Sequence, residues 1–381
     1  MKKENSRHNG IVIIVGVLIF FVIAGFITKS IVESQIEKFI SKEINADDTA
    51  NKLIISTEKE DCTIPHKREF NKQLYYTGPL IDTHLHMPVA SKIFSDIAIQ
   101  SGFEDMPHIG QIPISKIVCL MNKENIIKAF GFFLSPNTGL DQSISNVINV
   151  NKKYPDKFVS FFQPPLPIQQ LFPKTSDVEE ILKNNPGLYG GYGEIRFDFN
   201  LGQNTLPNDN YQLEMYELSD KNNLIVQVHP AQGQAQILKQ LLKKYPNVIF
   251  LVHLMKDEQI EMIELLETHD NMYYSLDAEL SYIFGYKTIQ NNRGPTKQEF
   301  LDSMRQNFDS RLKEGLDRWK TVIEKHPNKF TWGSDRWFTW HFDEDVGALL
   351  EEFSRSFIGQ LDLSVQEKFA YKNAEEMLRK K

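Results

Sequence analysis

The stretch IDTHLH at residues 81–86 sets the frame for the rest of the chain. It continues the short apolar run 79–81, and its alternation has the two-residue period of a β-strand. On a strand, His84 and His86 lie on the same face, so their imidazoles converge on one point. Neutral imidazole is the commonest metal ligand among side chains. The pair therefore predicts a metal site, but one such pair arises easily by chance among ten histidines.

The composition is that of an ordinary globular protein. The chain has 381 residues, of which 41% are hydrophobic and 24% charged, and a net charge of -7. This length allows one large domain or two ordinary ones. Charged residues form no long single-sign block, so we expect no nucleic-acid partner. The two cysteines, Cys62 and Cys119, are too few for a disulfide framework or a cysteine-based metal site, and we expect Cys119 to be a buried thiol.

The N-terminal region predicts a membrane anchor. Residues Ile11–Ile27 are uncharged and almost wholly apolar, and Lys2, Lys3 and Arg7 precede them. As a helix this run spans roughly 26 Å, just enough for a thin hydrocarbon core. The basic flank predicts a cytoplasmic N-terminus and an extracytoplasmic body. A cleaved signal peptide ending near Val22–Ala24, and hence a secreted protein, is the alternative, which the length of the run disfavours.

We expect three parts in the chain. Residues 1–28 form a cytoplasmic stub and the transmembrane anchor. Residues 29–74 form a helical stalk and linker, because apolar residues recur at roughly helical spacing over 28–44. The catalytic domain covers 75–381.

Apolar runs and helical patterns alternate through this domain. We expect strands at the apolar runs 79–85, 117–121, 158–162, 189–197, 224–229, 248–253, 271–276 and 329–334. Helical candidates lie between them at 142–154, 177–184, 209–222, 232–245 and 256–269, and residues 296–325 are helical material that suits a lid. Eight strands separated by helices predict an α/β protein with a (β/α)8 TIM barrel.

Polar residues stand at the C-terminal ends of five of these strands, where a barrel carries its chemistry. Taken singly, each histidine among them could be an ordinary core histidine, and Glu194 could form an ion pair with Arg196. Together, such groups in one barrel mouth would each need a partner, and a divalent cation supplies one for all. The predicted metal ligands are His84, His86, Glu194, His229, His253 and Asp335.

Three further residues are candidates for substrate contact. Arg196 lies two residues beyond Glu194 on the same strand face, and Arg336 follows Asp335 directly. Both could bind a carboxylate or phosphate by paired hydrogen bonds, or pair with acidic neighbours instead. Trp337 could wall the pocket. These residues fit a small, anionic substrate.

The ligand pattern resembles the amidohydrolase superfamily of metal-dependent barrels, on His84-x-His86, His229, His253 and Asp335. Within it, the chain is similar to the amidohydrolase-related (amidohydrolase 2) family of hydrolases and decarboxylases. The segments KYPDKF at 153–158, WGSD at 332–335 and KNAE at 372–375 support this resemblance over residues 79–381.

The resemblance implies one Zn-type ion held by His84, His86, His229 and Asp335, with a bound water that becomes hydroxide near neutral pH. It also implies that Asp335 or His253 takes the proton of that water.

Glu194 departs from this family and is similar to the strand-four glutamate of TatD-like deoxyribonucleases, which bridges two metals. If Glu194 bridges, His253 becomes a ligand of the second ion. One or two ions are therefore compatible with the sequence, and we expect one tight site with a weaker second.

The sequence thus predicts a membrane-tethered, metal-dependent hydrolase acting on an ester, amide, lactone or phosphoester. A decarboxylase on the same scaffold and a non-catalytic binding protein are the alternatives.

Overall fold

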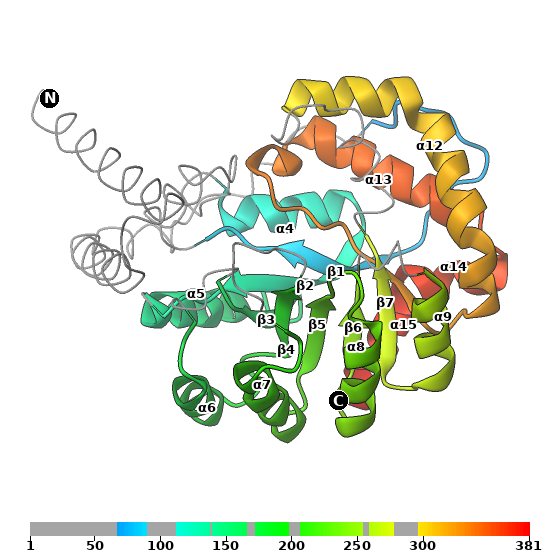
Figure 1. Cartoon of the computed structure of the whole chain (residues 1–381). Coiled ribbons are helices and arrows are strands. Elements are labelled where there is room, and N and C mark those ends of the chain that lie inside the picture. Colours follow the sequence, from blue (N-terminus) through cyan, green and yellow to red (C-terminus); the bar gives the residue numbers. More distant parts are fainter. Residues whose placement is uncertain are drawn as a thin grey trace, which may run out of the picture.

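The sheet of the protein is built from eight parallel strands. The computed structural model describes residues 67–89, 112–137, 139–165, 172–197, 206–253, 259–277 and 296–381. The strands follow one another around the sheet in chain order, as Figure 1 shows. They are β1 Leu80–His86, β2 Ile126–Leu134, β3 Phe158–Gln163, β4 Gly191–Arg196, β5 Ile225–His229, β6 Phe250–Val252, β7 Met272–Leu276 and β8 Phe330–Trp332.

The sheet closes on itself between β1 and the residues just after β8. The backbone N–H of Asp335 donates to the carbonyl of His84 at 2.7 Å, and that of His86 donates to the carbonyl of Arg336 at 3.2 Å. These parallel contacts join the first strand to the last. The predicted (β/α)8 barrel is confirmed.

The Asp82 carboxylate holds this closing junction together. One of its oxygens accepts the backbone N–H groups of His84 (3.0 Å) and Ser334 (2.8 Å), and the other accepts the Ser334 hydroxyl at 2.5 Å. All three residues are buried. Asp82 therefore satisfies two buried backbone donors, one on each side of the junction.

Helices surround the sheet, and the predicted ones are confirmed to within a few residues. Those between the strands are α4 Ile114–Lys123, α5 Leu140–Lys153, α6 Thr175–Asn184, α7 Asn210–Lys221, α8 Ala235–Lys244, α9 Gln259–Thr268 and α12 Lys297–Lys325. After β8 come the 3-10 helix η4 Thr339–Phe342, α13 Glu344–Ile358, α14 Leu363–Glu367, the π-helical turn η5 Lys368–Lys372 and α15 Asn373–Lys380.

The predicted second strand at 117–121 is wrong, because these residues form the middle of α4. The helix lies between β2 and the chain around η4 and α13 (Figure 1), so all five residues are buried. A fully buried helix segment shows no amphipathic period and looks like a buried strand in the sequence. The true second strand, β2, was missed because Lys128 and Gly131 interrupt its apolar run.

The protein has two apolar cores, an outer one that joins the helices to the sheet and an inner one. The inner one fills the barrel, and its members are Ile81, Phe130, Phe132, Phe161, Ile225, Ile249, Leu251, Tyr273, Ala374 and Met377. The last two belong to α15, which therefore closes one end of the barrel. The Lys380 ammonium reaches the Tyr273 hydroxyl at 2.9 Å from the same side. The strand-end polar residues lie at the opposite end.

The chain begins to pack on the domain before the predicted boundary at 75. The Phe70 ring stacks on Phe308 of α12 at 4.3 Å, and the Glu352 carboxylate of α13 accepts the N–H groups of Glu69 and Phe70. The helical material predicted as a lid is α12. It packs on the outside of the barrel through Trp319, whose ring lies 5.6 Å from that of Tyr274.

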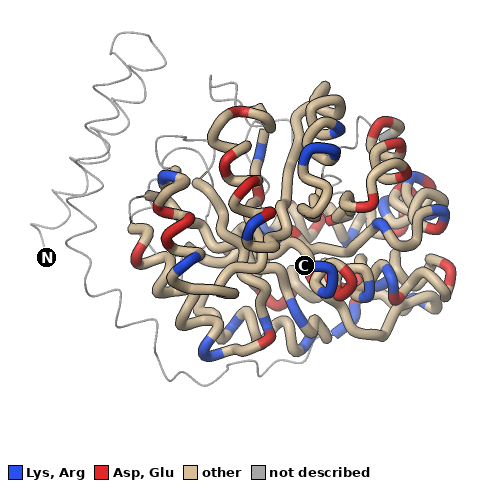
Figure 2. The backbone as a smooth tube through the Cα atoms, turned by 90° about the horizontal axis from the view of Figure 1, so that it is seen from below, with Lys and Arg blue, Asp and Glu red and all other residues tan. Residues whose placement is uncertain are grey.

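Charged residues of both signs are distributed along the outer helices, as Figure 2 shows. Several form exposed pairs between neighbouring helices, such as Lys221 with Glu179 at 2.6 Å and Lys325 with Glu267 at 3.0 Å. Exposed pairs contribute little to stability. The barrel therefore depends on its two cores and on the closing junction.

The predicted anchor Ile11–Ile27 and the stalk helix over 28–44 lie outside the described residues. Within the part of the chain that the structure describes, none of the helices combines the length and apolar character needed to cross a membrane.

Cys119 on α4 is disulfide-bonded, so the expectation of a buried thiol is wrong. Burial in an apolar run is common to both forms of cysteine, which is why the sequence pattern did not separate them. The other cysteine of the chain, Cys62, lies outside the described residues.

We predict that Asp82→Ala lowers the free energy of unfolding by about 2–6 kcal/mol, because two buried N–H groups lose their acceptor at roughly 1–3 kcal/mol each. Asp82→Asn should cost less, since its amide oxygen still accepts. Urea denaturation followed by circular dichroism measures both. Asp270→Ala, which removes a fully exposed carboxylate, is the control and should leave the midpoint unchanged. An Asp82→Ala midpoint equal to that of the control would show that the junction does not depend on this carboxylate.

Candidate functional site

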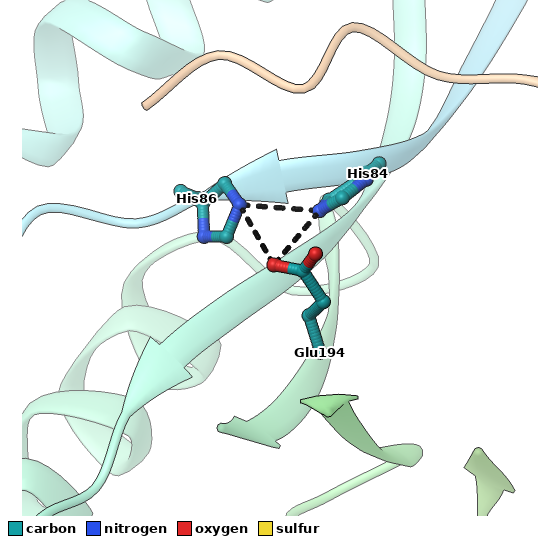
Figure 3. A group of neighbouring side chains, drawn as sticks. All are labelled: His84, His86 and Glu194. Carbon is teal, nitrogen blue, oxygen red and sulfur yellow. Dashed lines mark hydrogen bonds and ion pairs between the residues drawn. The ribbon is translucent and has the colours of Figure 1, made fainter. Parts of the chain in front are cut away.

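The Glu194 carboxylate lies between two pairs of histidines. Its Oε1 is 2.7 Å from His253 Nε2 and 3.2 Å from His229 Nδ1. Its Oε2 is 3.5 Å from His86 Nε2 and 3.8 Å from His84 Nε2. Figure 3 shows Glu194 pointing from β4 towards the two histidines of β1. One side chain thus faces donors from three other strands.

Asp335 completes the β1 side of the cluster. The Nε2 atoms of His84 and His86 lie 3.1 Å apart, and Asp335 Oδ1 lies 3.5 Å from the first and 3.3 Å from the second. The backbone bond from Asp335 to the His84 carbonyl sets this approach. The closing junction of the barrel therefore also brings together predicted ligands that come from the first strand and from the segment after the last strand.

A close approach between β4 and β5 turns Glu194 into the barrel mouth. Gly193 has φ +120°, and a Cβ there would lie 2.3 Å from the carbonyl oxygen of Gln227. Only glycine fits this position. The register of the two strands shifts between Tyr192 and Ile195, whose side chains join the outer core. Glu194 between them is left facing the interior.

Asp277 belongs to the cluster although the sequence analysis missed it. It follows β7 directly and is fully buried. Its Oδ2 lies 2.9 Å from His84 Nδ1, and its Oδ1 lies 3.5 Å from His253 Nδ1. The signal was its position immediately after the predicted strand 271–276, the position that His253 occupies after its own strand.

The contacts within the cluster raise the pKa values of two histidines and lower that of Glu194. Burial lowers the pKa of His253, but the nearby carboxylates of Asp277 and Glu194 outweigh burial and hold it well above the usual value. Burial likewise opposes protonation of His84, yet Asp335 and Asp277 raise its pKa. Burial raises the pKa of Glu194, but the facing histidines hold it well below the ordinary range.

The donor atoms fit a divalent cation. Among the described residues, three groups bring one ligand atom per residue within 4.8 Å of one another. Imidazole nitrogen and carboxylate oxygen are the ligands that zinc-type ions take in hydrolytic sites. The groups are His84, His86 and Glu194; Glu194, His229 and His253; and His84, His253 and Asp277.

Arg336 is not brought to the cluster by the structure. Its guanidinium is buried and donates to the Glu124 carboxylate at 2.7 Å and to the Gly347 carbonyl at 3.5 Å. Burial lowers the pKa of Arg336, but the Glu124 carboxylate outweighs burial and the pKa is raised. We assign Arg336 to an internal ion pair between the segment after β8 and the end of α4.

Arg196 and Trp337 lie at the edge of the cluster. Arg196 ends β4 in register with His229 of β5 and is half-buried. Trp337 is half-buried, its ring stacks on Phe338 at 4.2 Å, and its backbone N–H donates to His341 Nδ1 at 3.1 Å. A role of Arg196 and Trp337 in substrate contact stays a prediction.

Comparison with known proteins places these features in a family context. The model of a family described as amidohydrolase matches residues 137–380. An uncharacterized TIM-barrel protein from Bordetella bronchiseptica is 15% identical and has a TM-score of 0.50, with 79% of this chain and 99% of that chain covered. An amidohydrolase from Burkholderia multivorans with bound zinc is 13% identical, with the same TM-score of 0.50 and the same coverage of 79% and 99%. At such identities the likeness shows the fold.

A probable 2-pyrone-4,6-dicarboxylic acid hydrolase from Acinetobacter baumannii with bound citric acid is 15% identical over 79% of this chain and 99% of that chain, with a TM-score of 0.47. No curated protein matches the sequence.

We predict that metal binding releases protons at neutral pH. The raised pKa values of His84 and His253 favour protonated rings, and a protonated ring must lose a proton before its nitrogen binds a cation. Affinity should therefore rise with pH until both raised pKa values are passed. Calorimetric titration with Zn²⁺ in two non-coordinating buffers of different ionisation enthalpy measures the proton count. His253→Gln should release fewer protons, and equal apparent enthalpies in both buffers for the wild type would contradict the prediction.

Proposed function

The chain belongs to the amidohydrolase family and is an enzyme of that type, and from this premise we propose that it is a metal-dependent hydrolase. The observation that carries the proposal is the position of Glu194 between the β1 histidines and the pair His229 and His253. So many buried imidazole nitrogens and carboxylate oxygens need a common positive partner. A divalent metal is that partner.

The two oxygens of Glu194 support two ions. Oε2 faces His84 and His86, and Oε1 faces His229 and His253. A carboxylate with one oxygen towards each pair is suited to bridge. We therefore propose a shared Glu194 with two full sites, where the sequence predicted one tight site with a weaker second.

Zinc is the proposed metal, because histidine nitrogen and carboxylate oxygen make up the donor set. Zinc bound in the Burkholderia multivorans amidohydrolase is consistent with this choice. When bound, such ions lower the pKa of a water from about 15.7 towards 7 and polarise the substrate carbonyl or phosphoryl oxygen.

Asp335 is the proposed general base. Its carboxylate lies beside the β1 histidines. The Asp335 side chain is 13% exposed, whereas the Glu194 side chain is 5% exposed. Asp335 would take the proton of the attacking water and pass it to the leaving group. His253 is bonded to Glu194 through Nε2, so we propose it as a ligand rather than as the base.

Arg196 is the proposed contact for an anionic substrate. It stands beside His229 in the strand register, at the rim of the mouth. A guanidinium there can bind a carboxylate or phosphate by two parallel hydrogen bonds. We propose a small ester, amide, lactone or phosphoester that carries a negative group.

We propose that the enzyme is tethered to a membrane with its barrel outside the cytoplasm. The apolar run Ile11–Ile27 and its basic flank support the anchor. The disulfide at Cys119 supports an oxidising compartment, since such bonds are rare in the cytosol.

A substrate screen with the metal-loaded full chain tests the proposal. Hydrolysis of an anionic ester, lactone, amide or phosphoester is the expected result. Release of CO₂ from aromatic carboxylic acids, without hydrolysis, would identify a lyase instead. Full metal occupancy without turnover of any compound would favour a binding protein.

Glu194→Gln separates one ion from two. We predict two zinc equivalents in the wild type, and in the variant the loss of one equivalent and of more than about 100-fold in kcat/KM, because a neutral amide bridges poorly. Elemental analysis and steady-state kinetics measure both. His326→Ala, which removes the histidine at the C-terminal end of α12, where it faces Glu267, is the control and should keep both values. A single equivalent in wild type and variant alike would show that Glu194 does not bridge.

Fractionation tests the tether. Full-length protein should remain in the membrane pellet after high salt and alkaline carbonate, because a spanning helix resists both. Replacing two apolar residues of the run by lysine should release the protein. A soluble species beginning near Gly25 would show that the segment is a cleaved signal.

A further inference from the structure

We propose that Asp277 is a positioning residue that fixes the ring orientation and tautomer of two metal-binding histidines, His84 and His253. The inference rests on the proposed metal function and adds a residue to it. Asp277 approaches both rings from the side opposite Glu194. Its two oxygens divide between them.

The geometry at His84 sets the tautomer. Asp277 Oδ2 lies 2.9 Å from Nδ1, while Nε2 at the other end of the ring faces His86 Nε2 at 3.1 Å. An ionised carboxylate only accepts hydrogen bonds, so Nδ1 carries the proton. The lone pair of the neutral ring is then on Nε2 and points to the cluster. Histidine ligands commonly donate their second N–H to a carboxylate in this way.

His253 meets the other oxygen of the same carboxylate. Its Nδ1 lies 3.5 Å from Asp277 Oδ1, and its Nε2 lies 2.7 Å from Glu194. The rings of His84 and His253 are perpendicular, with centroids 4.6 Å apart. One carboxylate therefore lies against both Nδ1 atoms, hydrogen-bonded to that of His84 and within ion-pair distance of that of His253. Asp277 links a histidine of one donor pair to a histidine of the other.

The surroundings hold Asp277 rigidly enough for this role. A Cβ on Gly333 would lie 3.2 Å from the Asp277 Cβ and 3.0 Å from that of His84, so glycine lets the three strand ends approach. One layer below, the Ser275 hydroxyl is 3.0 Å from that of Thr83. Asp277 thus sits on a hydrogen-bonded layer of the barrel. A supported carboxylate keeps its ligands within the narrow range of geometry that a metal requires.

Direct ligation by Asp277 is the competing role, since His84, His253 and Asp277 can also surround an ion. That ion would bind both Nδ1 atoms, and the Nε2 atoms would then need a second metal or a proton. The 2.9 Å separation at His84 is that of a hydrogen bond. The geometry therefore favours positioning over ligation.

The test uses the full chain loaded with Co²⁺, whose unpaired electrons shift the proton resonances of bound imidazoles. We compare the wild type with Asp277→Ala, Asp277→Asn and the matched control Tyr273→Phe. The control removes a hydroxyl from the same strand at the α15 end of the barrel, where it contacts Lys380. Chelator competition gives affinity and stoichiometry. Proton NMR in H₂O and D₂O gives the exchange of the ring N–H groups.

In the wild type we expect at least one shifted ring N–H that exchanges slowly, because Asp277 shields it. Asp277→Ala should bind the same number of ions about 10–100-fold more weakly, and this resonance should disappear. Asp277→Asn keeps a neutral acceptor of the same size, so its loss should be smaller and its fold intact. Tyr273→Phe should match the wild type in affinity and in the N–H signal.

Three results would overturn the inference, and they are distinct from one another. Wild type that binds no Co²⁺ would remove the proposed metal function itself. Wild-type affinity and N–H protection in both Asp277 variants would leave the metal function and dismiss Asp277. Loss of a whole metal equivalent in Asp277→Asn, with the affinity of the other unchanged, would show that Asp277 is a ligand.

Discussion

The hydrogen bonds that close the barrel between β1 and the residues after β8 are the constraint on which the site depends. Asp82 accepts N–H groups from both sides of this junction, and Asp335 donates to the His84 carbonyl. Without the junction, the ends of the sheet would lie apart and Asp335 would not meet the β1 histidines. The same few bonds therefore give the fold its closed form and the cluster its composition.

The cluster is a concentration of buried charge that the fold tolerates only by pairing. Glu194, Asp277 and His253 are all buried, and each carboxylate faces histidine nitrogens on more than one strand. An unpaired buried charge would cost several kcal/mol. Protons on the imidazoles compensate the carboxylates in the metal-free protein, and a cation replaces those protons when it binds. Stability and metal affinity thus draw on the same contacts.

Sequence reasoning recovered the parts of the molecule that depend on local pattern. His229 and His253 were found because each ends an apolar strand abruptly, and a parallel barrel gathers strand ends at one mouth. The second strand was misplaced, because five consecutive buried apolar residues, 117–121, in the middle of α4 look like a buried strand. Asp277 was missed although it directly follows a predicted strand, and the Glu124 partner of Arg336 was missed because that contact joins residues 212 positions apart.

The closing junction also sets the topology of the loop that a bound ion would complete. Asp82 and Ser334 are 252 positions apart in the sequence, and an ion shared by the β1 histidines and Asp335 spans nearly the same distance. Such an ion is a reversible cross-link between the two ends of the domain. Joining distant points removes more chain entropy from the unfolded state than joining near ones. The metal would then stabilise the whole barrel. Its loss would first destabilise the contact between β1 and β8, which is a strand of only three residues.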